Sequence, residues 1–317
     1  MDLSAEWGAS VSTRYSVSAL VEAGVLREEA IGGWRLPGVE DHPVPEDGEI
    51  VVFEDFFKRG LGVPVHPFLI GLCSYYQISI HNLSSNSVLL VAIFVHFCEI
   101  YLGVYPHFDL FRYLFKLRRR GGEGGSRIAG SVSLSPRDGV RDRWLGCPFR
   151  DAAAGWIRRW FYVHAADVPR CDVVVVPERL PSWEAERPEC SGEVAALMGM
   201  IPVGEVDGPG VVGNFFDRRV QVLQRRLSPG WQYQGVGDVT RMSSDELSEE
   251  EVTERVAELF DLRPRVYRAA PNQKAAFSAG HPLRPVSIFL HFLLSCCSSA
   301  MIWVLMFSFF LSRVLGS

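Results

Sequence analysis

The sequence contains very little lysine and no pair of cysteines at metal-binding spacing. Three of its 32 basic residues are lysines, Lys58, Lys116 and Lys274. This dominance of arginine fits either bidentate recognition of phosphate or a GC-rich coding sequence. Seven cysteines are present, but no C-x-x-C occurs. The odd number indicates free thiols in a reducing compartment and argues against a disulfide framework or a zinc knuckle.

Three catalytic signatures are absent as well. An aspartic protease needs D-[ST]-G and a reverse transcriptase needs an aromatic-x-D-D turn, and neither occurs. A two-metal nuclease or transposase needs three carboxylates that gather ions about 3.5–4 Å apart. Asp109, Asp138 and Asp142 lie in basic or loop surroundings, without a strand–strand–helix pattern around them. The sequence therefore predicts no catalytic residues, no metal and no cofactor.

The composition allows a large core and carries little overall charge. Of the 317 residues 48% are hydrophobic, enough for one large domain or two small ones, and the formal net charge is −5. The charge is uneven, with ten basic and three acidic residues over 112–150, and eight acidic residues and one arginine over 243–262. These two segments either contact each other or bind separate partners.

Caps and apolar periodicity predict a mainly helical first half. We expect helices over residues 13–24, from Pro67 onward and over 84–103, and then an amphipathic helix with a basic end in "HFDLFRYLFKLRRR" (107–120). Residues rich in proline, glycine and acids before position 49 indicate a linker. The predicted organisation is an N-terminal helical segment and linker over 1–42 and a mainly helical central domain over 43–120.

Beyond the glycine-rich break at 121–127 the sequence favours β-branched and aromatic residues. We expect short strands in "IAGSVSLS", "WIRRWFYVHA" and "CDVVVVP", a loop in "GPGVVGN" and a helix in "NFFDRRVQVLQRRL". An acidic helix near 243–262 is expected to begin with a capping box at Ser243 or Ser244. These elements predict an α+β extension over 121–284, with short strands after residue 127, and an α+β fold class.

One stretch, "FVHFCEIYLG" (94–103), offers His96, Cys98 and Glu99 within a few residues. On an α-helix His96 and Glu99 share a stripe, while Cys98 points about 160° away from it. The three side chains then cannot meet around one ion, so we expect no metal here. His96 and Glu99 are expected to form a polar seam, either on the surface or as a buried contact.

Two groups of arginines are candidates for phosphate contacts, one before the glycine-rich break and one with i, i+7 spacing on a single helix face. They are Arg118, Arg119, Arg120, Arg218, Arg219, Arg225 and Arg226. Nearby aromatic residues would stack on bases; they are Trp156, Trp160, Phe161, Tyr162, Trp231 and Tyr233. The simpler interpretation is a solvated helix face and an ordinary aromatic core.

Several segments between Pro43 and Arg118 resemble the gypsy-type transposase domain of plants, which is associated with retrotransposon-derived reading frames. The resemblance rests on "RGLGVPVHPF", "HNLSSNS", "FVHFCEIYLG" and "PHFDLFRYLFKLR", and looser similarity continues through "WIRRWFYV", "RRVQVLQRRLSPGWQYQGVGDVTRMS" and the acidic helix. It implies an association with mobile elements and supplies no catalytic residues. We therefore expect a non-enzymatic retrotransposon-derived protein. The alternative is a nucleic-acid-binding module of a mobile element, and a metal-dependent nuclease ranks last.

The last apolar segment, residues 286–312, contains 27 residues without a formal charge. About 20 apolar residues suffice to span a bilayer. The sequence thus predicts one C-terminal transmembrane helix that anchors the protein to a membrane, with the preceding domain in the cytosol. A second interpretation is that the abrupt change in composition near Pro285 is a translated intron, in which case the protein is nuclear or cytoplasmic.

Overall fold

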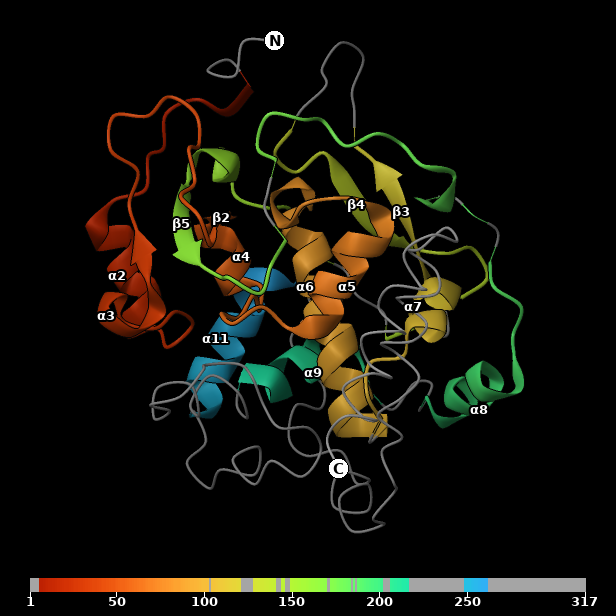
Figure 1. The fold of residues 1–317 in the computed structure, drawn as a ribbon. Helices are drawn as coiled ribbons and strands as arrows, with labels where there is room; N and C mark the ends of the chain where they lie inside the picture. The colour runs from red at the N-terminus through yellow and green to blue at the C-terminus, as the bar shows by residue number, and fades with distance from the viewer. Residues whose placement is uncertain are drawn as a thin grey trace, which may run out of the picture.

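The computed structural model describes residues 6–102, 104–120, 128–140, 144–145, 149–169, 172–183, 185, 187–201, 206–216 and 248–261. This part of the chain has a helical centre flanked by two small sheets, which confirms the α+β class (Figure 1). The helices are α2 (Arg14–Glu22), α3 (Glu29–Gly32), α4 (Glu54–Lys58), α5 (Pro67–Tyr76), α6 (Ser85–His96), α7 (Phe108–Leu114), α8 (Gly192–Met200), α9 (Gly208–Phe215) and α11 (Glu249–Leu259). Short 3₁₀ turns η1 (Ile80–Asn82), η3 (Trp156–Arg158) and η4 (Pro181–Trp183) and the π-helix η2 (Phe97–Leu102) connect them. The strands are β1 (Trp34–Arg35), β2 (Glu49–Phe53), β3 (Phe115–Arg119), β4 (Val132–Pro136) and β5 (Trp160–His164).

Helix α6 lies at the centre of the molecule. Ser84 caps it by accepting a hydrogen bond from the backbone N–H of Ser87, and nearly every residue of the helix is buried. The prediction of a capped, buried central helix is therefore confirmed. Its α-helical part ends at His96, where the chain continues as the π-helix η2. A π-helical segment rotates the following side chains away from the positions that an α-helix would give them.

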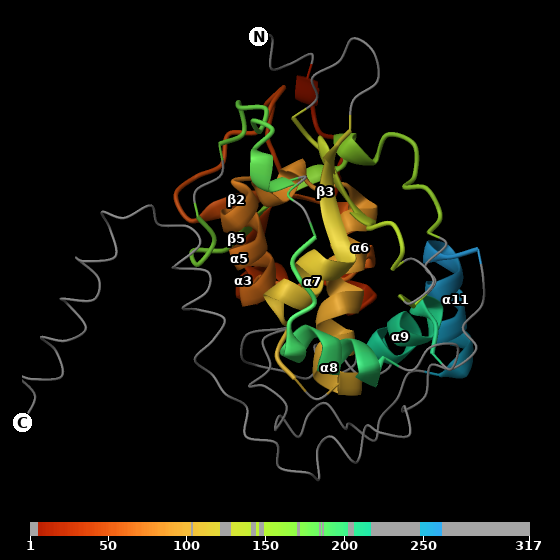
Figure 2. The same ribbon diagram turned by 90° about the vertical axis from the view of Figure 1, so that its right-hand side faces the viewer.

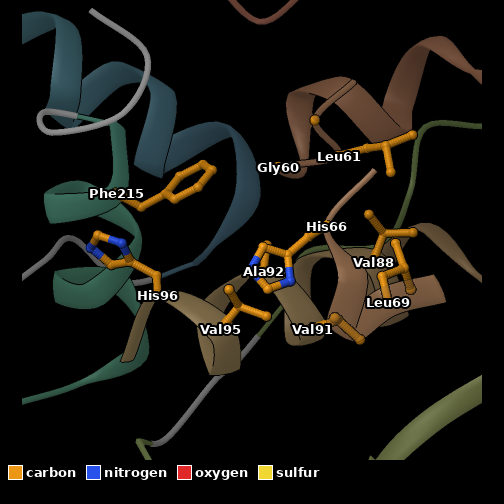
Figure 3. Close-up of a pocket in the computed structure, with 11 residues that line it drawn as sticks. Gly60, Leu61, His66, Leu69, Val88, Val91, Ala92, Val95, His96 and Phe215 are labelled. Carbon is orange, nitrogen blue, oxygen red and sulfur yellow. The ribbon is translucent and has the colours of Figure 1, made fainter. Parts of the chain in front are cut away.

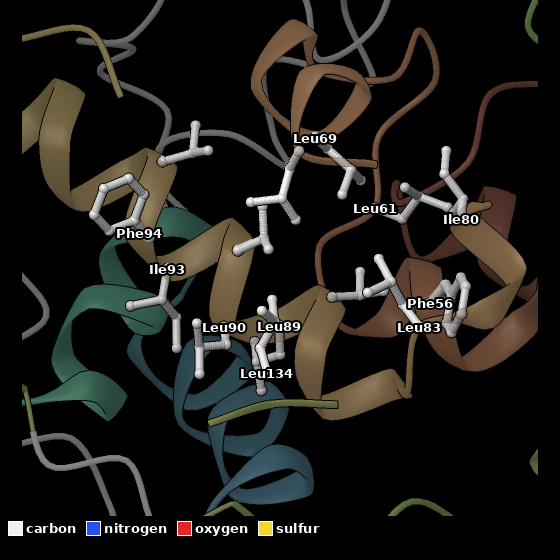
Figure 4. Packing of buried hydrophobic residues seen from close by; sticks show 14 of the residues in the cluster. Phe56, Leu61, Leu69, Ile80, Leu83, Leu89, Leu90, Ile93, Phe94 and Leu134 are labelled. Atoms are coloured by element: carbon white, nitrogen blue, oxygen red, sulfur yellow. The ribbon is translucent and has the colours of Figure 1, made fainter. Parts of the chain in front are cut away.

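The hydrophobic core surrounds α6 on several sides. Figure 4 shows Leu89, Leu90, Ile93 and Phe94 of this helix among apolar residues of the neighbouring segments, such as Leu134. The ring of Phe94 is fully buried and contacts four other aromatic side chains, those of Phe68, Phe111, Phe115 and Trp144. Burial of such large rings contributes much of the stability of a domain.

The first sheet joins segments that are distant in the sequence. Its strand order is β1-β5-β2, and β5 pairs antiparallel with both neighbours, with Ile50 opposite Val163. The run "IVVF" in β2 is rich in β-branched residues and is completely buried. The expectation that strands occur only after residue 127 is therefore wrong, since β1, β2 and β3 all precede that position.

The predicted amphipathic helix over 107–120 is also wrong in its second half. Helix α7 ends at Leu114, and β3 begins at once and pairs antiparallel with β4. In β3 the buried Phe115 and Leu117 alternate with the more exposed Lys116 and Arg118. This two-residue period places one face of the strand on the core, and the pairing of Leu117 with Leu134 fixes its register.

Three further predictions need correction. "GPGVVGN" forms the buried helix α9 rather than a loop, because Asp207 caps it by accepting a hydrogen bond from the N–H of Gly210. No strand forms over residues 172–177. The acidic helix α11 starts at Glu249, and its capping box joins Ser248 and Glu251 rather than Ser243 or Ser244. Helix α8, which was not predicted, packs on α7.

The expected transmembrane segment, residues 286–312, lies outside the described residues. Within the part of the chain that the structure describes, no helix combines the length and apolar character that crossing a membrane requires.

Candidate nucleic-acid interface

The end of β3 carries three consecutive arginines into solvent. Arg118, Arg119 and Arg120 are all exposed. The backbone N–H of Arg120 bonds to the carbonyl of Ser131 at 2.6 Å, so the hairpin geometry continues past the end of the strand. Side chains alternate along a strand, so Arg118 and Arg120 project to one face and Arg119 to the other. These arginines thus extend from a strand. The prediction that they lie at the end of a helix is wrong.

A fourth exposed arginine, Arg158, lies in the 3₁₀ turn η3, whose first residue contacts this hairpin. Gly130, just before β4, is packed so tightly against the indole of Trp156 that a Cβ there would lie 2.8 Å from the ring. Arg158 follows in the same 3₁₀ turn and donates from Nε to the carbonyl of Ala9 at 3.1 Å. We call Arg118, Arg119, Arg120 and Arg158 the basic end of the molecule; β3 runs toward the same side from which β5 starts (Figure 1).

The sequence missed Arg158 because "WIRRWFYVHA" was interpreted as one continuous strand. The signal was present, since the apolar residues of β5 begin only at Trp160 and leave the preceding arginine pair outside the sheet. The second arginine of the pair, Arg159, interacts with the buried Glu54 at 3.5 Å and is therefore not included in the basic end.

The prediction that aromatic residues of this segment stack on bases is wrong for three of them. Trp160, Phe161 and Tyr162 are fully buried in β5, the central strand of its sheet. Trp156 is partly buried, with its ring against Phe53 and Phe56. The remaining predicted contact residues lie outside the described residues: Arg218, Arg219, Arg225, Arg226, Trp231 and Tyr233.

The acidic helix α11 does not cover the basic end. It lies away from β3 in both orthogonal views (Figures 1 and 2) and packs on α9. The last arginine of the basic stretch, Arg150, does reach it: its Nε lies 3.1 Å from the carboxylate of Asp261 and 3.1 Å from the carbonyl of Phe260. Among the described residues the two charged segments therefore meet around Arg150, and the arginines of β3 stay exposed.

The three residues of "FVHFCEIYLG" are buried and point to different partners. His96 Nε2 lies 2.9 Å from Asn214 Oδ1 on α9, and Glu99 Oε1 lies 3.4 Å from His66 Nε2. Cys98 is fully buried, and this burial raises the pKa of its thiol so that it stays protonated. The seam is thus a set of buried contacts between helices. The absence of metal stays a prediction.

A small cavity of about 50 Å³ lies beside this region. Figure 3 shows it between α6, the segment around Gly60 and Leu61, and Phe215, with His66 and His96 on its wall. Its remaining lining is mainly aliphatic. His66 Nδ1 accepts a hydrogen bond from the N–H of Phe68, which places the proton on Nε2 toward Glu99. Both ring nitrogens of His66 are therefore engaged within the protein.

Carboxylates and other metal ligands do not converge in the described residues. No group of three His, Cys, Asp or Glu side chains there is arranged to hold a metal ion. Within this part of the chain, the basic end is thus a better candidate for a functional surface than any reaction centre.

One segment of the chain is similar to a domain described from transposons. Residues 50–119 match a family model described as "Putative gypsy type transposon". No curated protein and no solved structure matches the chain. The matched segment starts in β2, includes α4 to α7 and ends at Arg119, the last residue of β3. Residues 50–119 of this chain are therefore similar to the gypsy-type transposon domain.

Proposed function

We propose that this chain is a non-enzymatic protein of transposon origin that binds nucleic acid through its basic end. The exposure of Arg118, Arg119 and Arg120 at the end of a hairpin, which the turn that holds Arg158 contacts through Trp156, carries the proposal. Guanidinium groups present planar forks of donors that match phosphate oxygens. Phosphate contacts carry no sequence information, so binding is expected to depend on charge rather than on base sequence. Supercoiled plasmid incubated with the protein and Mg²⁺ or Mn²⁺ should stay uncut.

The contribution of the basic end is measurable as a salt dependence. The logarithm of the binding constant falls linearly with the logarithm of the salt concentration, and each phosphate contact on a duplex adds about 0.9 to the size of this slope. Replacing Arg118 and Arg120 with alanine should therefore reduce the slope by about 1.8. Fluorescence anisotropy with a labelled duplex at several salt concentrations provides the measurement.

A control variant separates position from net charge. Arg14→Ala with Arg27→Ala removes the same charge from the region of α2, and it should leave the slope close to that of the unchanged protein. Equal slopes for the two double variants would mean that the end of β3 does not contact phosphate. Replacing Arg218, Arg219, Arg225 and Arg226 with alanine tests the second predicted group in the same assay.

We further propose, from the sequence, that residues 286–312 anchor the protein to a membrane. Their 27 uncharged residues would reach about 40 Å as a helix, beyond the ~30 Å of a hydrocarbon core. The full chain should then pellet with membranes and resist carbonate extraction, while residues 1–284 should stay in the supernatant. Recovery of the full chain as a monodisperse protein without detergent would rule out the anchor. Transcript reads across codon 285 would show whether the segment is expressed.

A further inference from the structure

An uncharged histidine is sealed inside the molecule without hydrogen bonds to its ring. His81 lies in the 3₁₀ turn η1 and is completely buried, and neither ring nitrogen has a hydrogen-bond partner among the described residues. The backbone around it is firmly held: its carbonyl accepts a hydrogen bond from Gly130, and Asn82 forms a capping box with Ser79. The backbone that carries the imidazole is therefore fixed on both sides of His81.

Trp7 packs against this ring and bonds to the segment that begins at Asp172, and we call these two parts together the cover. The indole of Trp7 lies 5.4 Å from the imidazole, between ring centroids, and is also packed against Phe53 and Trp160. Its Nε1–H donates to the carbonyl of Val173 at 2.9 Å. Neither residues 8–13 nor residues 172–177 belong to a helix or strand. Such segments open at a lower free energy than the core elements they cover.

The N-terminal strap, residues 6–13, runs beside the segment that leads into β5. The carbonyl of Gly8 accepts a hydrogen bond from Trp160 Nε1, and the carbonyl of Ala9 accepts one from Arg158 Nε. The N–H of Val11 donates to the carbonyl of Arg158 at 2.7 Å. The strap thus connects the cover of His81 to one arginine of the basic end.

Burial sets the charge of His81. Loss of hydration lowers the pKa of His81 to about 4, and the carboxylate of Asp172 opposes this change. Asp172 is the charged group among the described residues that acts on this ring. Since an uncovered imidazole has a pKa of about 6.5, the uncovered form binds a proton first as the pH falls. Acidification between about pH 6.5 and pH 4 therefore favours the uncovered form, and the cover is stable above this range.

We propose that Trp7 and Val173 form an acid-weakened cover, which opens from His81 more often in mildly acidic solution and, when open, exposes the ring to water as an imidazolium. The strap leaves together with Trp7, and Arg158 then loses its carbonyl partner Ala9. Helix α6 is expected to stay folded during this step, because the contacts given above join the strap to η1, β2, β5, Arg158 and Val173 and not to α6.

Hydrogen exchange of the full-length protein tests the proposal. Exchange is followed by mass spectrometry, and protection factors are corrected for the intrinsic effect of pH. Between pH 7 and pH 5 the opening equilibrium should increase roughly twenty-fold, as follows from the two pKa values. Peptides covering residues 6–13 and 172–177 should lose protection accordingly, while peptides from α6 should not change.

A substitution isolates the role of the imidazole. His81→Gln keeps a polar side chain that does not titrate, and its strap should keep constant protection from pH 7 to pH 5. His164→Gln, at an exposed histidine, is the matched control and should open as the unchanged protein does. An independent readout on the unchanged protein is the NMR signal of the His81 ring, which should titrate together with strap release.

Three results would overturn the proposal. The first is a strap that stays protected down to pH 4.5. The second is loss of protection in the strap and in α6 at the same pH, which would indicate global unfolding. The third is equal opening in folded His81→Gln. If that variant does not fold, the NMR titration of the unchanged protein decides alone. A His81 ring that titrates with a pKa near 6.5 while the strap stays protected would show that the ring is not sealed from water.

Discussion

Phe94→Ala is expected to lower the free energy of unfolding by about 3–5 kcal/mol, enough to unfold a large share of the molecules of a marginally stable domain. The ring is fully buried in α6 and contacts four aromatic side chains from α5, α7, β3 and the segment at Trp144. These neighbours belong to different elements, so they cannot close the resulting cavity by a single shift. Urea denaturation followed by circular dichroism measures the loss.

Tyr15→Ala provides the comparison. This aromatic side chain is 87% exposed on α2, so its removal should change the free energy of unfolding by less than about 0.5 kcal/mol. If Phe94→Ala were as harmless as Tyr15→Ala, the central position of α6 in the core would be wrong.

Asp55→Ala is expected to lower the free energy of unfolding by about 3–5 kcal/mol, because it leaves a buried guanidinium without its counter-ion. The side chain of Arg59 is 3% exposed, and its Nε donates to Asp55 Oδ2 at 2.8 Å. Its Nη1 donates to Asn86 on α6, so this arginine connects α4 to the central helix. Unfolding in urea again measures the change.

Two controls distinguish burial of charge from loss of a contact. Glu29→Ala breaks the exposed pair with Arg14, whose N···O distance of 2.7 Å is similar, and should lower the free energy of unfolding far less than Asp55→Ala does, because solvent screens this pair. Adding Arg59→Met to Asp55→Ala removes the uncompensated charge and should recover most of the lost stability. A double variant that is less stable than Asp55→Ala alone would show that the packing of Arg59, rather than its charge, is what matters.

Local signals in the sequence were sufficient for several helices. Ser84 caps the central helix and Pro67 opens α5 as expected, because both depend on side chains within one turn of the helix end. The buried character of α6 followed from its unbroken apolar run. The strand β3 was missed because "FKLRR" fits a helix as readily as a strand until its partner, β4, is known. A period of two over five residues is too short to decide alone.

The candidate site likewise combines residues that local sequence patterns reveal with residues that they do not reveal. Arg118, Arg119 and Arg120 were found because consecutive arginines beside a glycine-rich break are visible in the sequence. Arg158 and His81 were missed because their roles depend on neighbours that are distant in sequence. Trp7 covers an imidazole more than seventy positions away, and Ala9 holds a guanidinium nearly one hundred and fifty positions away. No local pattern carries such information.

The order of strands in the first sheet also has a consequence for synthesis of the protein. Strand β2 needs β5, which leaves the ribosome about a hundred residues later. At translation rates of about 5–20 residues per second, the apolar segment "IVVF" waits roughly 5–20 s without its partner. A nascent β-strand with free edges associates readily with other unfolded chains. The nascent chain therefore exposes β2 to association with other unfolded chains until β5 has been made.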